Sequence, residues 1–156
     1  MTLASFNASP PGKAVAVMLS CCASRRFAAT MAAGRPYPPL AAAEGATRTA
    51  FESLNWDDVL EAMSAHPRIG ARVGGQSAAE QSGVADSSRA ALAAGNARYE
   101  ERFGHVFLIC ATGLSGEQMR AALEERLSHD PATEQAVATA ELEKITLLRV
   151  AKALAA

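Results

Sequence analysis

The sequence predicts an all-α fold, a single compact domain of about eight helices. Alanine accounts for 36 of the 156 residues, whereas aromatic residues make up only 5%. Alanine is the best helix former because it loses no side-chain entropy in a helix, and sheets favour aromatic and β-branched residues instead. A chain of this length is typical of one domain, and no stretch is long enough to separate two. We therefore expect residues 1–156 to form one helical domain.

Start signals for four helices can be read in the first 65 residues. Pro10 and Pro11 suit a first helical turn, because the N–H that proline lacks is not needed there. Asn55 is a suitable N-cap for a helix that begins at Trp56. The predicted helices cover residues 10–22, 26–33, 41–53 and 56–65.

The second half of the chain predicts a short helical turn and three longer helices. Ser115 and Gln118, three residues apart, form a capping box, and Gly104 is a natural helix stop. The short apolar run 107–110 does not decide between a strand and a buried helix. The expected elements are a turn at 78–81 and helices at 86–102, at 117–127 and from 131 onward, the last with an apolar stripe at Leu142, Ile145 and Leu148.

Charge and composition exclude several classes of function. The formal net charge is −1 and the sequence pI is about 6.3, so we expect no basic surface for a nucleic acid. No apolar run is long enough to span a membrane. The three cysteines are an odd count with two adjacent, which suits a reducing cytoplasm better than a disulfide framework. Their spacing from the histidines does not match a zinc site, so we predict no metal.

The segment after Lys13 has some features of a signal peptide with a lipoprotein cysteine, but we expect it to be the first core helix. A single lysine after two prolines does not make the usual charged leader region. Val15, Leu19 and Cys22 recur at helical spacing, so we expect these three side chains to form the buried stripe of that helix.

His66 is the first candidate for chemistry, and it opens the pentapeptide His66-Pro67-Arg68-Ile69-Gly70. A residue before proline is pushed out of the α region, so His66 is expected where the preceding helix ends. The negative end of the helix dipole favours the protonated ring, and histidine is the side chain most easily tuned for proton transfer near neutral pH. The imidazole is therefore either a general acid–base group or a cap for the last helical carbonyl groups, and the pentapeptide leaves both open.

The stretch Ser77–Gln81 is the second candidate. Ser77 with Glu80 is by itself a capping box. Glu80 is equally able to accept a proton from the ring of His66 and orient it, and Gln81 offers two donors and an acceptor to a polar ligand. Only proximity in the fold decides between these readings.

The run Phe107–Ala111 is the third candidate. It is expected to be buried, and backbone groups in a non-helical segment are available to the amide edges of a ligand. Cys110 within this apolar run is predicted to be a core residue and not a nucleophile. The chain has no phosphate-binding loop, nucleophile elbow or zinc-protease signature.

Several motifs follow one another in a characteristic order. They are Arg35-Pro36-Tyr37, His66-Pro67-Arg68-Ile69-Gly70, Ser77-x-x-Glu80-Gln81, Asn96-x-x-Tyr99-x-x-x-Phe103-Gly104, Phe107-Leu108-Ile109-Cys110-Ala111 and Ile145-x-x-Leu148-Arg149. Each is weak alone, but the ordered set extends over nearly the whole chain. It resembles the 2-oxo-4-hydroxy-4-carboxy-5-ureidoimidazoline (OHCU) decarboxylases, carboxy-lyases of the last step from urate to (S)-allantoin.

This resemblance implies a compact all-α domain, usually a homodimer, that acts on a small ureidoimidazoline without a metal or organic cofactor. The C-terminus lacks a peroxisomal address, so a cytoplasmic enzyme is expected. The resemblance implies that His66 is the catalytic histidine, and we assign Glu80 to orient it. The residues implied to line the substrate site are Pro67, Ser77, Ala78, Ala79, Glu80, Gln81, Phe107, Leu108, Ile109, Cys110 and Ala111. The alternative is a non-catalytic helical module for ligand binding or dimerisation.

Overall fold

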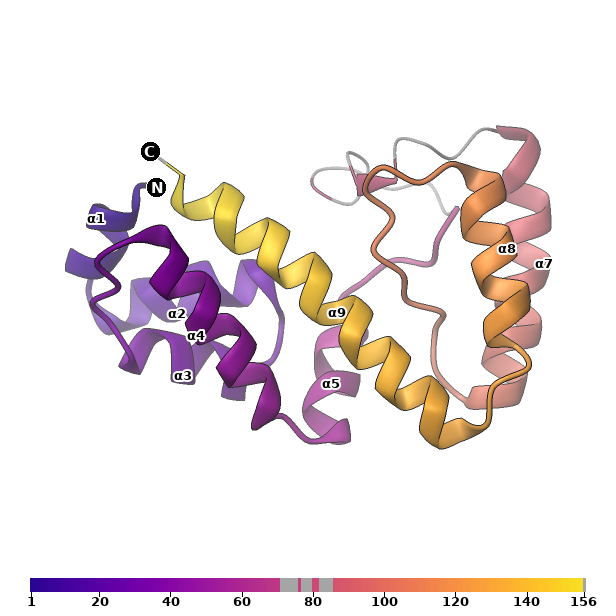
Figure 1. The fold of residues 1–156 in the computed structure, drawn as a ribbon, viewed down its shortest axis with the longest axis horizontal. Coiled ribbons are helices and arrows are strands. Elements are labelled where there is room, and N and C mark those ends of the chain that lie inside the picture. The colour runs from indigo at the N-terminus through magenta and orange to yellow at the C-terminus, as the bar shows by residue number, and fades with distance from the viewer. Residues whose placement is uncertain (71–75, 77–79, 82–85, 156) are drawn as a thin grey trace. The chain divides into compact units, whose positions relative to one another are not determined.

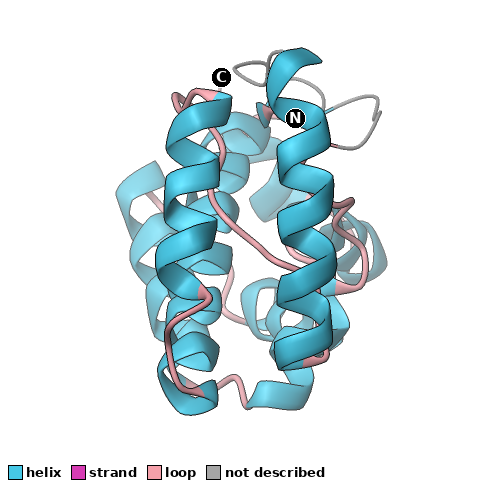
Figure 2. Ribbon diagram, turned by 90° about the vertical axis from the view of Figure 1, so that its right-hand side faces the viewer, coloured by secondary structure: helices cyan, strands magenta, loops and turns pink. Residues whose placement is uncertain are grey.

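The computed structural model describes residues 1–70, 76, 80–81 and 86–155, and in this part of the chain it consists of helices and loops without a strand (Figure 2). The all-α prediction is therefore confirmed. None of the described helices combines the length and the apolar character needed to cross a membrane. The helices are α1 (Leu3–Ala8), α2 (Pro11–Cys21), α3 (Arg25–Ala33), α4 (Leu40–Glu52), α5 (Trp56–Met63), α7 (Asp86–Phe103), α8 (Gly116–Arg126) and α9 (Pro131–Leu154).

The contacts within the chain form two compact units. The first unit comprises Met1–Ala62 and Leu142–Ala156, and the second unit comprises Met63–Glu141. Helix α9 therefore contributes its first eleven residues, Pro131 to Glu141, to the second unit and the remainder to the first. The candidate site residues that the structure describes all belong to the second unit.

Local capping signals place several helix ends where the sequence predicts them. The Oδ1 atom of Asn55 accepts the N–H of Asp58 at 2.9 Å, which caps α5. Ser115 and Gln118 form the predicted capping box of α8, with the Gln118 N–H 3.2 Å from the Ser115 hydroxyl. The short helix α1 was not predicted; the side chain of Thr2 caps it. These bonds satisfy N–H groups that the first helical turn leaves without a partner.

The buried face of α2 differs from the predicted stripe by one residue. The buried positions within this helix are Ala14, Met18 and Cys21. Val15 and Leu19 are half-buried, whereas Cys22, just after the helix, is buried as expected. Residues 14–19 of this helix are all apolar, so spacing alone does not identify the face that packs inward.

The apolar stripe of α9 also needs a correction. Leu142 and Ile145 are buried as predicted, but Leu148 is 48% exposed. At 3.6 residues per turn, Leu148 lies about 120° around the helix from Leu142. The buried stripe continues instead through Thr146 and Val150.

The second unit is built on one hydrophobic cluster. Helices α7 and α8 pack against each other, as Figure 1 shows on its right-hand side. Gly95 of α7 permits this close approach, because a Cβ atom at this position would lie 2.7 Å from Cδ2 of Leu123 in α8. The buried members of the cluster are Ile69, Leu92, Tyr99, Phe107, Ile109, Ala111, Met119 and Leu123.

Candidate active site

His66 follows the end of α5 in a turn. The helix ends at Met63, two residues earlier than the predicted Ala65, and the His66 N–H donates to the Met63 carbonyl at 3.0 Å. This bond spans three residues, as in a tightened last turn, and Pro67 prevents the helix from continuing. The predicted position of His66 at the end of a helix is therefore confirmed, and its side chain is half-buried.

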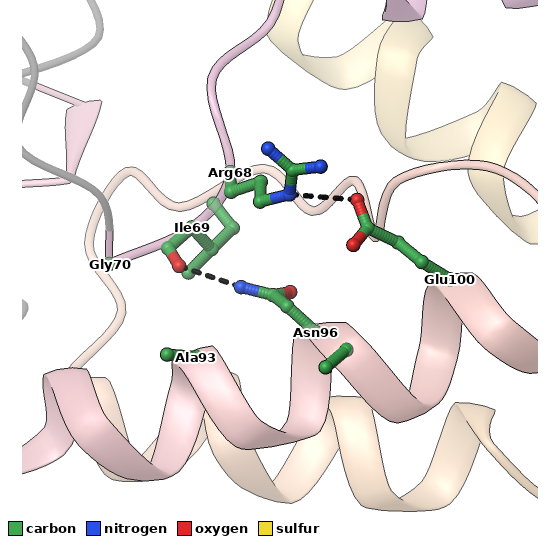
Figure 3. A pocket seen from close by; sticks show the side chains of 7 residues that line it. Arg68, Ile69, Gly70, Ala93, Asn96 and Glu100 are labelled. Carbon is green, nitrogen blue, oxygen red and sulfur yellow. Dashed lines mark hydrogen bonds and ion pairs between the residues drawn. The ribbon is translucent and has the colours of Figure 1, made fainter.

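Helix α7 holds the segment after His66 through one of its faces. Arg89 donates to the Gly70 carbonyl at 2.7 Å, and Asn96 donates to the Ile69 carbonyl at 2.9 Å. Glu100 forms an ion pair with Arg68 at 2.8 Å (Figure 3). These three helix residues are seven and four positions apart, which places them on the same side of an α-helix. The helix thus satisfies the polar groups of a segment that has no helical bonds of its own.

The backbone at Gly70 requires a glycine. Its φ is +85°, a left-handed conformation that residues with a Cβ rarely adopt. A Cβ atom here would also approach the Cβ of Leu92 to 3.3 Å. The turn therefore depends on glycine both for conformation and for contact with α7.

The structure brings one predicted member of the 77–81 stretch to this segment. The Gly70 N–H donates to Oε1 of Gln81 at 2.9 Å. Glu80 is half-buried, and its pairing with His66 stays a prediction. The other three predicted residues, Ser77, Ala78 and Ala79, lie outside the described residues.

A pocket of about 300 Å³ lies between this segment and α7 (Figure 3). Asn96 is 3% exposed at its wall, and its Oδ1 is a buried atom without a hydrogen-bond partner in the part of the chain that the structure describes. Of the predicted site residues that the structure describes, none lines this pocket. Its lining residues are Arg68, Ile69, Gly70, Ala93, Asn96, Ala97 and Glu100.

The segment Phe107–Ala111 is neither helix nor strand, and its alternate side chains Phe107, Ile109 and Ala111 enter the same cluster as Ile69. Cys110, predicted to be a core residue, is only half-buried. The Leu108 carbonyl accepts a hydrogen bond from Nη1 of Arg126 at 2.6 Å. The Cys110 N–H donates to Oε1 of Glu141 at 3.1 Å. In the described part of the chain, no hydrogen bond occupies the N–H or C=O of Ile109, which lies between them. Side chains of α8 and α9 thus hold two residues of the segment, while the peptide groups of the residue between them are left for another partner.

A buried ion pair that was not predicted from the sequence lies beside this segment. Nε of Arg126 donates to Oε1 of Glu134 at 2.7 Å, and the Tyr99 hydroxyl donates to the same oxygen. Nδ1 of His129 lies 3.1 Å from the second carboxylate oxygen. Arg126 is 5% exposed and Glu134 is fully buried. A basic residue in the last turn of a helix is usually solvated, so the sequence carried no signal for this pair.

The environment of this pair shifts two pKa values in opposite directions. Burial raises the pKa of Glu134, but hydrogen bonds from Arg126 and Tyr99 and the charge of Arg126 outweigh it and hold this pKa below its usual value. Burial, followed by the hydrogen bond to Glu134, raises the pKa of the Tyr99 phenol. Glu134 is therefore a carboxylate at neutral pH, and Tyr99 remains a protonated donor.

Taken together, the second unit offers a titratable imidazole, an amide and peptide groups for a polar ligand. Within the described residues, no three His, Cys, Asp or Glu side chains come together as ligands for a metal ion.

Comparison with known proteins identifies the family. The family model of OHCU decarboxylase matches residues 7–151. The uric acid degradation bifunctional protein TTL of Arabidopsis thaliana is 38% identical over 144 aligned positions, and the match covers 85% of this chain but 44% of that protein. An OHCU decarboxylase of Haloferax volcanii is 28% identical over 125 aligned positions, and the match covers 76% of this chain and 74% of that protein.

Solved structures lead to the same family. A crystal structure of OHCU decarboxylase in the presence of (S)-allantoin has a TM-score of 0.75 and 38% identity, covering 87% of this chain and 95% of its own. A crystal structure of (S)-allantoin synthase, at 19% identity and a TM-score of 0.73, covers 99% of this chain and 54% of its own, and it shows the shared fold. From the ordered motifs, the family model and these relatives together, the chain belongs to the OHCU decarboxylase family.

Proposed function

We propose that this chain decarboxylates OHCU to (S)-allantoin. The observation that supports the proposal is the 38% identity to an OHCU decarboxylase whose structure was solved in the presence of (S)-allantoin. The match covers 95% of the length of that protein. In support, the described parts of the predicted site all belong to the second unit; they are 66–70, 80–81 and 107–111.

The chemistry of this substrate needs no electron sink outside the substrate itself. One ring carbon carries both the hydroxyl and the carboxylate, and its neighbour is doubly bonded to nitrogen. When CO₂ leaves, the electrons of the broken C–C bond form a double bond to the neighbouring carbon, and the C=N electrons move to nitrogen, which takes a proton. The resulting enol loses its hydroxyl proton and gains a proton on the neighbouring carbon. Delivery to one face of that carbon gives a single enantiomer.

In this proposal His66 contacts the substrate hydroxyl and relays its proton, and Glu80 orients the imidazole. Such proton transfer contributes typically about 10²–10⁴-fold, so positioning of the carboxylate out of the ring plane supplies the rest. Oε1 of Gln81 accepts the Gly70 N–H, so the NH₂ group of Gln81 is the part that we propose meets the substrate.

The remaining contacts are assigned to peptide groups and apolar walls. The N–H and C=O of Ile109 are the groups we propose bind the amide edges of the ureido arm, because the adjoining Leu108 carbonyl and Cys110 N–H are already bonded to Arg126 and Glu141. The other residues proposed to line the site are Pro67, Ser77, Ala78, Ala79, Phe107 and Ala111.

We further propose that residues 1–156 act as one domain in a cytoplasmic homodimer, without metal or organic cofactor. Sedimentation equilibrium tests the homodimer, because it measures the mass of the assembly. Calorimetric and van't Hoff enthalpies of unfolding that agree would support a single cooperative domain; two separate transitions would contradict it.

The direct test couples purified urate oxidase and hydroxyisourate hydrolase to this protein and follows the optical activity of allantoin. We expect faster formation of (S)-allantoin than in the spontaneous reaction, with no change after EDTA treatment. A racemic product at the spontaneous rate would favour the non-catalytic helical module, and loss of activity on chelation would contradict the cofactor-free mechanism.

The roles of the two catalytic residues are tested by His66→Ala and Glu80→Gln. His66→Ala should lower kcat by about 10²–10⁴-fold, as expected for loss of a general acid–base group. Glu80→Gln keeps the shape but removes the charge, so it should lower kcat more than it raises KM. Glu124→Gln, on the exposed face of α8, is the matched control and should leave both constants unchanged. An unaltered kcat in Glu80→Gln would return Glu80 to its role as a capping residue.

A further inference from the structure

The segment Phe107–Ala111 lacks the regular hydrogen bonds that hold a helix or a strand. Its course depends instead on side chains that reach it from later helices. A short side-chain hydrogen bond runs from Nη1 of Arg126 to the Leu108 carbonyl, at 2.6 Å. The guanidinium also stacks on the ring of Phe107, with Cζ 4.5 Å from the ring centroid. One side chain therefore contacts both the backbone and the first aromatic ring of this segment.

Glu134 determines the direction of that guanidinium. Two nitrogens of Arg126, Nε and Nη2, donate to Glu134, which leaves Nη1 directed at Leu108. The carboxylate is held in turn by the Tyr99 hydroxyl and by His129. Since the guanidinium is planar and presents its donors in a rigid fork, fixing two donors on the carboxylate also fixes the third.

We propose that Arg126 and Glu134 form a positioning pair for the substrate site, an inference that rests on the proposed function. Neither residue touches substrate. Their role is to hold the Leu108 carbonyl so that the peptide groups of Ile109 are presented in one orientation. A purely structural ion pair would stabilise the second unit without affecting substrate binding once the protein is folded.

The test removes the donor without leaving a buried charge. In Arg126→Met/Glu134→Gln both charges disappear together, and replacement of a buried pair by neutral side chains often preserves the fold. The matched control is Arg98→Met/Glu124→Gln, which removes an ion pair of the same chemistry between α7 and α8 where both side chains are about half exposed. The measurements are kcat, KM, the Kd of (S)-allantoin, and hydrogen exchange of the 107–111 amides.

We expect KM and the Kd of (S)-allantoin to rise about tenfold in the first double variant, because the segment must then be ordered when the ligand binds. Its kcat should change less, and exchange should accelerate at 107–111. The control should match the wild type in all four measurements. A folded first variant with wild-type KM, Kd and exchange would overturn the proposal.

If the double variant does not fold, Arg126→Lys tests the positioning role instead. Lysine keeps a positive charge for Glu134 but has a single nitrogen, which cannot reproduce the three-donor arrangement. A raised KM with faster exchange supports the positioning role, and unchanged values overturn it. Inactivity of the wild-type protein would refute the proposed function instead, and the exchange data would still report whether the pair orders the segment.

Discussion

Two non-helical segments, 66–70 and 107–111, share one hydrophobic cluster but are held by different chemistry. The first is held at the edge of a pocket by the amide groups of Gln81 and Asn96 and by Arg89, whose side chain is only half-buried. The second is held by Arg126, whose charge is buried and paired. Both solutions satisfy peptide groups that a helix or a sheet would otherwise satisfy.

The difference concerns what remains after a mutation. Loss of a neutral amide leaves one peptide group without its bond, at a cost of about 1–3 kcal/mol. Loss of one partner from a buried ion pair leaves a charge in a region that solvates it poorly, and this typically costs about 3–5 kcal/mol. The segment 107–111 should therefore be the more rigid of the two and the less tolerant of change.

The largest effect is expected for Glu134→Ala. This change leaves the buried guanidinium of Arg126 unpaired and removes the acceptor of the Tyr99 hydroxyl, so the free energy of unfolding should fall by about 3–5 kcal/mol. Urea denaturation measures it. Glu124→Ala, which breaks the exposed pair with Arg98, serves as the control and should cost no more than about 1 kcal/mol. Equal effects of the two changes would remove the distinction between the segments.

Acid should weaken the second segment through the same carboxylate. The pKa of Glu134 is lower in the folded than in the unfolded state, so its stabilising contribution is complete above the unfolded pKa of about 4.3. As the pH falls below that value and through the folded-state pKa, the contribution is lost. Chemical denaturation from pH 7 to pH 2 should show a steeper loss of stability in the wild type than in Glu134→Gln. Parallel curves would contradict the lowered pKa.

Asn96→Ala should have an intermediate effect on the first segment. It removes the bond to the buried Ile69 carbonyl, and we expect a loss of about 1–3 kcal/mol in urea denaturation. Amide exchange should accelerate at residues 66–70 and remain unchanged at 107–111, because the partners of the second segment are intact. Faster exchange in both segments would show that the shared cluster couples them.

The smallest effect is expected for Arg68→Met. Its partner is Glu100 at 2.8 Å, but the arginine side chain is 61% exposed, so solvent and salt screen the pair. The stability should change by about 0–1 kcal/mol, and any difference from the wild type should disappear at high salt. A larger, salt-independent loss of stability would indicate that this ion pair maintains the structure of the pocket wall.

Much of the fold was predictable because helix ends depend on nearby residues. The caps at Asn55 and Ser115 and the end of the helix before His66 follow from side chains three residues away or from a proline. Part of the candidate site was predictable in the same way, since Pro67 requires a turn. The contact of Gln81 with Gly70 was not, because it joins residues eleven positions apart.

The sequence by itself determined that the chain is helical, where most helices begin and end, and which ordered motifs connect it to its family. Only the tertiary structure decided which faces are buried, as Met18 and the exposed Leu148 illustrate. It also decided that the apolar run 107–111 is neither strand nor helix and that Arg126 is buried beside it. The physical reason is range: caps and turns act over three or four residues, whereas a buried charge is stable only beside a partner that the folded chain brings to it.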